Sequence, residues 1–108
     1  MNEQKPLISQ AFQTFMSEAP DHAGAWGGLV QALSQASALD TKSSALAYLA
    51  VLAVLRLESG IPFHVKAAKE AGASREEIIS AILIGLPAAG HVVTQSLPVA
   101  ISAFNEAG

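Results

Sequence analysis

Cysteine is absent from this chain of 108 residues. A chain without thiols cannot build a disulfide framework, offer thiolate ligands to zinc or run a thiol-based peroxidase cycle. Aromatic residues are also few, at 6% of the chain, and charged residues make up only 14%. The lack of cysteine is the firmest exclusion that the sequence provides.

Positive charge is scarce and dispersed. The chain has six Lys or Arg residues against nine Asp or Glu residues, and its formal net charge is −3. Nucleic-acid binding requires a clustered basic face that neutralises several phosphates. We therefore expect no nucleic-acid partner.

Long hydrophobic runs are missing as well. The longest extends from Ala45 to Leu55 and is stopped by Arg56, well short of the roughly 18 to 20 apolar residues that span a bilayer. The first residues are polar and lack the apolar core of a signal peptide. We expect a cytoplasmic protein that does not bind membranes.

Apolar side chains, by contrast, are abundant. Hydrophobic residues make up 51% of the chain, which predicts one folded domain over residues 1–108 instead of a disordered segment. A domain of this size has little interior volume and cannot bury so much apolar surface alone. We expect a homo-oligomer.

Apolar residues recur with helical spacing, and no alternating strand pattern is present. Gly60 is expected to end the central apolar helix in a left-handed conformation, with Pro62 at the first position of the next helix. Ser74 and Glu77 form a capping-box pattern. The predicted helices cover about 6–17, a segment after Asp21, a segment after Asp40, Pro62 to Gly72, a segment from Ser74, and 92–104 with a kink or break at Pro98. Short connections between them indicate an all-α, compact multi-helix bundle.

The segment 57–79 carries the most specific pattern. His64 lies at a helix start, and Gly72-Ala73-Ser74-Arg75-Glu76-Glu77-Ile78 follows as a helix stop and a new cap. Together with flanking sequence over about 39–104, this pattern resembles the carboxymuconolactone decarboxylase and alkylhydroperoxidase D-like family, whose hallmark is Cys-x-x-Cys-x-x-x-His followed by a similar turn. The resemblance implies an all-α bundle of the alkylhydroperoxidase D-like type that assembles into trimers or hexamers.

The same resemblance places the two family cysteines at Leu57 and Gly60, and the relay glutamate of the peroxidase branch at Ala45. These residues offer no acid, base or nucleophile, so we expect no thiol peroxidase. The decarboxylase branch depends on neither a cysteine pair nor a cofactor. The resemblance therefore implies lyase-type acid–base chemistry on a small organic carboxylate or lactone.

His64 is the principal catalytic candidate. The positive end of a helix dipole disfavours imidazolium and favours a neutral base at this position. The alternative is a histidine that only caps the helix or packs against neighbours. Glu58 and His91 are secondary catalytic candidates, each with a structural alternative: a solvated carboxylate at a helix end, and a hydrogen-bonded histidine at a helix break.

Four residues around His64 are the expected substrate-binding set. Arg56 would bind a carboxylate through its guanidinium fork, although an ion pair with Glu58 or Asp40 is an equal alternative. The other expected binding residues are Leu57, Gly60 and Phe63.

No metal and no cofactor are expected, because the spacings of His and carboxylate residues match no standard ligand motif. A rival interpretation gives the chain no catalysis at all. In that case it would be an oligomeric binding or scaffolding protein derived from an alkylhydroperoxidase-like antioxidant ancestor.

Overall fold

The computed structural model describes residues 8–107. Within that range the chain forms α-helices and short 3-10 segments, without any strand, so the predicted all-α class is confirmed. The helices fall into two compact units, one extending to Asp40 and the other beginning at Thr41. Each unit is described by itself.

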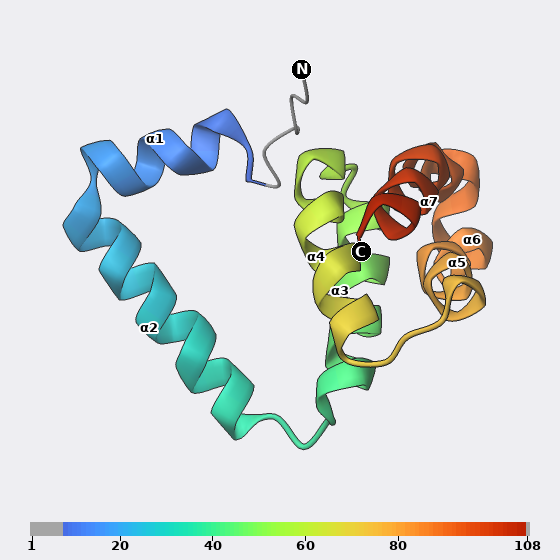
Figure 1. The fold of residues 1–108 in the computed structure, drawn as a ribbon, viewed down its shortest axis with the longest axis horizontal. Helices are drawn as coiled ribbons and strands as arrows, with labels where there is room; N and C mark the ends of the chain where they lie inside the picture. The colour runs from blue at the N-terminus through green and yellow to red at the C-terminus, as the bar shows by residue number, and fades with distance from the viewer. Residues whose placement is uncertain (1–7, 108) are drawn as a thin grey trace. The chain divides into compact units, whose positions relative to one another are not determined.

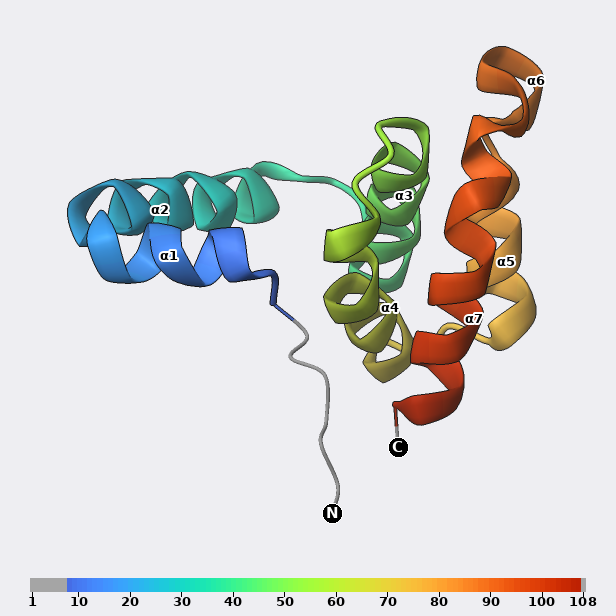
Figure 2. The same cartoon turned by 90° about the horizontal axis from the view of Figure 1, so that it is seen from above.

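The first unit is a pair of helices, α1 (Gln10–Glu18) and α2 (Pro20–Ala36), which contact each other and diverge at an angle from their junction (Figure 1), although they overlap in the view of Figure 2. The ring of Phe12 on α1 meets that of Trp26 on α2, with centroids 5.2 Å apart. No side chain from residue 8 to residue 40 is buried. This unit therefore has local contacts but no core.

The start of α1 differs from the prediction. Ser9 is extended and its side chain accepts a hydrogen bond from the Phe12 amide at 3.1 Å, so the helix begins at Gln10. A serine at this position satisfies one of the unpaired amides of the first turn. Pro6, the predicted start, lies outside the described residues.

The second unit contains α3 (Thr41–Val54), η1 (Glu58–Gly60), α4 (Ile61–Glu70), α5 (Arg75–Leu83), α6 (Leu86–Ala89), η2 (Gly90–Ser96) and α7 (Leu97–Glu106). Helix α3 packs against α4 and α5, and α4 packs against α7. The core is made of apolar side chains from all the longer helices. Its largest fully buried members are Leu49, Ile61, Ile78, Ile82, Val65 and Val93.

The end of α3 corrects the expectation for Gly60. The left-handed residue is Arg56, with φ 60°, whereas Gly60 has φ −88° and lies inside the next turn. The Leu57 amide donates to the Leu52 carbonyl and the Arg56 amide to the Ala53 carbonyl. These two bonds form a Schellman motif, which needs a left-handed residue after the helix whichever side chain is present.

The capping prediction for α5 is confirmed. The Ser74 side chain accepts from the Glu77 amide and the Glu77 carboxylate accepts from the Ser74 amide. Gly72, at φ 100°, ends α4 in a second Schellman motif, in which the Ala73 amide donates to the Ala68 carbonyl.

The C-terminal third is interrupted at Gly90, in the Pro87–Gly90 stretch where the sequence predicts a break, but the last helix differs from the prediction. Gly90 has φ 76°, and residues Gly90–Ser96 form a 3-10 segment that overlaps the start of the predicted 92–104 helix, so the final α-helix begins only at Leu97. Pro98 lies in the first turn of α7, where its missing amide costs nothing, so it starts a helix instead of kinking one.

One described stretch, Arg75–Glu106, is long and apolar enough to cross a membrane when judged by length and composition alone. In the structure it consists of α5, α6, η2 and α7. Its most buried side chains, Ile78, Ile82, Val93 and Ala100, belong to the core of the second unit. A core segment passes the same compositional test, and the turn at Gly90 divides this one.

Helix α7 is tied to α4 through Lys69. The ammonium of Lys69 donates to the carbonyls of Phe104, at 2.8 Å, and Ala107, and it lies 4.3 Å from the centroid of the Phe104 ring. Lys69 thus links α7 to α4, the helix that carries His64.

Candidate functional site

His64 lies at the end of the first turn of α4, as the sequence predicted. The helix is preceded by Gly60, has Pro62 in its first turn, and buries Ile61 and Val65 on either side of His64. The imidazole is itself half-buried. A histidine held between two buried core residues has a fixed backbone and a side chain that reaches the surface of the unit.

Two aromatic rings contact the imidazole. Tyr48, on α3, lies with its ring centroid 4.5 Å from that of His64 and the ring planes 47° apart. Phe63, the preceding residue on α4, lies at 5.1 Å and 76°. Both spacings fall in the range of favourable tilted and edge-to-face ring contacts.

Burial lowers the pKa of His64 from its ordinary value of 6.5, because a partly desolvated imidazolium is less stable than the neutral ring. No carboxylate contributes to this shift. The lowered pKa favours the neutral imidazole, which can accept a proton as a general base must.

Arg56 and Glu58 bind each other. The guanidinium donates to both carboxylate oxygens of Glu58, at 2.8 and 3.3 Å, and this ion pair raises the pKa of Arg56. Of the alternatives predicted for Arg56, the structure favours the pair with Glu58. Each group is engaged by the other, so neither orients His64 in this state.

The remaining predicted binding residues surround the same turn. Leu57 and Phe63 are about half exposed, at 49% and 47%. The Gly60 amide donates to the Leu57 carbonyl at 3.0 Å. A Cβ placed on Gly60 would meet only the methyl groups of Leu52, at 3.7 Å, an ordinary packing distance.

His91 lies on η2 and is exposed. Its carbonyl accepts a hydrogen bond from the Thr94 hydroxyl at 2.8 Å, which ties its backbone, while its imidazole has no ring contact or ion pair within the described residues. In residues 8–107, no three His, Asp or Glu side chains gather closely enough to hold a metal ion.

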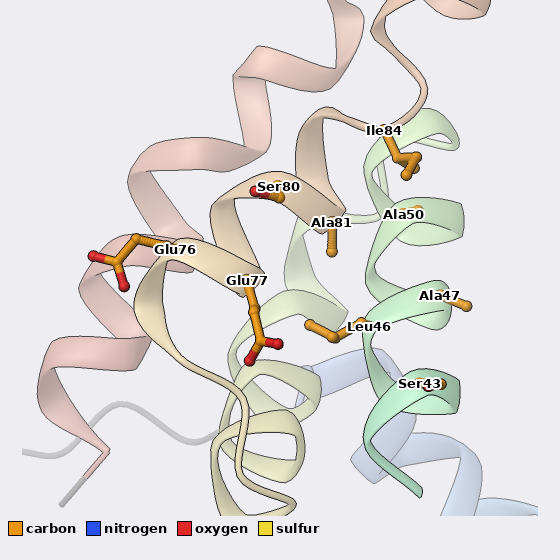
Figure 3. A pocket seen from close by; sticks show the side chains of 9 residues that line it. All are labelled: Ser43, Leu46, Ala47, Ala50, Glu76, Glu77, Ser80, Ala81 and Ile84. Atoms are coloured by element: carbon orange, nitrogen blue, oxygen red, sulfur yellow. The ribbon is translucent and has the colours of Figure 1, made fainter. Parts of the chain in front are cut away.

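A hollow of about 490 Å³ lies between α3 and α5, away from His64. Figure 3 shows the small side chains of Ser43, Ala47 and Ala50 along α3, with Glu77 directed toward α3 and Glu76 directed away from it. Glu77 is held by Lys42 at 2.9 Å. This groove is open and apolar, and it contains none of the predicted site residues.

Tyr48 is the site residue that sequence reasoning missed. It lies within the apolar run 45–55, where a tyrosine belongs to no functional motif and is expected to be one more core residue. Its contact with His64 depends on how α3 packs against α4, which residue spacing alone does not reveal.

Comparisons with known proteins add family evidence to this geometry. Residues 20–102 match the model of the Carboxymuconolactone decarboxylase family. A crystal structure of a carboxymuconolactone decarboxylase family protein from Legionella pneumophila, in its apo form, is similar with a TM-score of 0.77. The two sequences are 25% identical, and the match covers 90% of this chain and 87% of that chain. The comparison with curated proteins gives no match.

Proposed function

Since the chain belongs to the carboxymuconolactone decarboxylase family, we propose that it performs cofactor-independent acid–base chemistry on a small carboxylate or lactone, with His64 as the proton-transfer group. The observation that supports this proposal is a half-buried imidazole whose pKa is lowered by burial. Perturbed titratable groups at partly exposed positions are frequent in active sites.

The reaction would be a lyase-type decarboxylation. The bond between the lactone carbon and its carboxylate breaks, CO2 leaves, and the electron pair stays on the conjugated ring as an enolate that must be protonated. Because the carboxylate is already ionised, decarboxylation consumes one proton from solvent: the imidazole would take this proton from water and deliver it to carbon, which returns His64 to its neutral state. Leu57 and Phe63 would supply apolar contacts to the ring.

Arg56 would bind the substrate carboxylate in exchange for Glu58. The guanidinium already holds a carboxylate in a forked geometry, and it sits on a left-handed residue, a conformation that costs energy for a side chain other than glycine. Glu58 released in this way would become available to the site.

The test is CO2 release from carboxymuconolactone and related lactone acids, measured with the purified wild type and with a His64→Gln variant. Glutamine keeps the size and polarity of the side chain but cannot exchange a proton near pH 7. A His22→Gln variant, altered at an exposed position on α2, is the matched control. Turnover lost only in the His64 variant supports the proposal, and equal rates in all three proteins contradict it.

A second candidate is a non-catalytic binding protein. It is favoured by the mutual engagement of Arg56 and Glu58 and by the position of the α3–α5 hollow, which lies apart from His64. Binding of lactone acids without turnover, with equal affinity in wild type and the His64→Gln variant, would support this candidate.

We also propose that copies of the chain associate. Large apolar side chains are exposed on both units, including Leu29 at 56% and Leu33 at 61% on α2, and Val51 at 50% on α3. Exposed apolar surface of this kind marks protein–protein contacts. Light scattering after size exclusion would give the mass: a trimer or hexamer is expected, and a monomer at all concentrations contradicts the proposal.

Thiol peroxidase activity is not part of the proposal, and the absent thiols can be restored as a check. In a Leu57→Cys/Gly60→Cys variant, the hydrogen bond that closes this turn and the space at Gly60 would bring the two thiols within disulfide reach. We expect thiol titration to detect a disulfide in the oxidised variant, and peroxide consumption by the variant alone. Peroxide turnover by the wild type would contradict the exclusion.

A further inference from the structure

The contact between Tyr48 and His64 joins two helices. Tyr48 is flanked on α3 by Leu49, which is fully buried, and its partner is flanked on α4 by fully buried Val65. Both backbones are therefore anchored in the same core. A ring pair held at 4.5 Å by two anchored helices has little freedom to separate, which is how a site keeps a side chain in one geometry.

The two rings are exposed to different degrees. Tyr48 retains 46% of its exposure although its ring lies against the half-buried imidazole. The tyrosine thus acts as a cover on one side of His64, with its outer face in solvent. Phe63 meets the imidazole edge to face from its own helix, so the histidine is enclosed on two sides.

Several charged groups on and around α4 are engaged with other partners. On η1, Glu58 is held by Arg56, and on α5, Glu77 is held by Lys42. On α7, Glu106 accepts from Ser102. Lys69, on α4 itself, is bound to backbone carbonyls at the end of α7. No charged group contributes to the lowered pKa of His64, and the imidazole contacts the rings of Tyr48 and Phe63.

We propose that Tyr48 is a positioning residue for His64: its ring covers one face of the imidazole, limits rotation of the side chain and directs the uncovered nitrogen edge toward the substrate. The aromatic ring carries this role, and the hydroxyl does not. The catalytic consequence rests on the function proposed above, whereas the positioning itself does not.

The first test is an NMR titration of the His64 ring protons in wild type, Tyr48→Phe and Tyr48→Ala. The ring current of a covering tyrosine displaces these proton signals, so wild type and the phenylalanine variant should share a displaced signal that the alanine variant loses. The pKa of His64 should also move up toward 6.5 in the alanine variant only, because the desolvating cover is gone.

A Val51→Ala variant is the matched control, since it removes a half-exposed apolar side chain one helical turn further along α3. It should leave the His64 signals in place. Circular dichroism would establish that all variants are folded, as expected for a change at a half-exposed position. Identical His64 signals and midpoints in wild type and Tyr48→Ala would overturn the proposal, and so would a Tyr48→Phe variant that behaves like Tyr48→Ala.

The second test separates positioning from catalysis. If the wild type turns over a lactone acid, Tyr48→Ala should lower kcat at least tenfold with a smaller change in KM, and Tyr48→Phe should restore most of the rate. A change in KM alone would make Tyr48 a binding residue and overturn the positioning role. If the wild type has no turnover, the proposed function fails, yet the NMR comparison still decides whether Tyr48 orients His64.

Discussion

The two units of this chain bury their apolar side chains to different extents. In the unit that begins at Thr41, apolar residues from α3, α4, α5, η2 and α7 bury one another completely. In the α1–α2 pair no residue is buried, although α2 carries Trp26, Leu29, Val30 and Leu33 at helical spacing. A helical pattern predicts an amphipathic helix, but not what will cover its apolar face.

The two units therefore depend on different interactions for their stability. A buried core stabilises its own helices, whereas an isolated pair of short helices is marginal in water. The second unit also holds the candidate site, so His64 and its neighbours lie on the self-supporting part of the chain. The stability of α1 and α2 is expected to depend on contacts from outside the pair.

The largest expected effect separates the two units directly. Leu49→Ala removes a fully buried side chain and should lower the free energy of unfolding by about 2–5 kcal/mol. Leu29→Ala removes one that is 56% exposed and should cost less than about 0.5 kcal/mol in dilute protein. Urea denaturation at several protein concentrations measures both. A loss for Leu29→Ala that matches Leu49→Ala in dilute solution would erase the distinction.

The next effect concerns the closure of the second unit. Lys69→Met keeps the aliphatic stem but removes the hydrogen bonds to the carbonyls of Phe104 and Ala107, and it should cost about 2 kcal/mol. Lys66→Met, an exposed position on the same helix, is the control and should change stability by less than about 0.5 kcal/mol. Equal melting temperatures for the two variants would show that α7 is held by apolar packing alone.

The elements that local chemistry determines were predictable. The capping box of Ser74 and Glu77 and the helix stop at Gly72 are both predicted from residue types, because each satisfies backbone groups within a few residues. The left-handed residue after α3 was assigned to Gly60 and is Arg56. There the position of the helix end, set by packing of Leu52 and Ala53 in the core, overrides the preference for glycine.

In the candidate site, too, features set by local sequence are predictable and features set by packing between helices are not. His64 was identified from its place at a helix start and from a family resemblance, both of which are local in sequence. Tyr48 could not be identified, because its contact with His64 depends on the packing of α3 against α4. The pairing of Arg56 with Glu58 is one of three alternatives that the sequence leaves open, beside a substrate carboxylate and Asp40, and only the geometry of the turn selects it.

A smaller effect is expected at a buried hydroxyl without a hydrogen-bond partner in the core of the second unit. The Ser96 hydroxyl is buried and has no hydrogen-bond partner, which costs free energy because the group has left water without compensation. Ser96→Ala should therefore raise the free energy of unfolding by about 1 kcal/mol, which corresponds to a melting temperature higher by roughly 4 °C. A destabilised variant would reveal that the hydroxyl is satisfied in solution, for example by a buried water.

The smallest expected effect is the pH dependence contributed by His64. Its pKa in the folded protein lies below 6.5 because burial disfavours the charged ring, so between these two values the unfolded chain binds more protons than the folded one. The free energy of unfolding then rises with pH through this window: the contribution is fully present above 6.5 and is lost as pH falls through the folded pKa. Urea denaturation from about pH 5 to pH 7.5 should show a shallower slope for His64→Gln than for wild type. Identical slopes would mean that the His64 ring is solvated in solution. The second unit would then lack the burial that lowers the pKa of His64 and favours a neutral base.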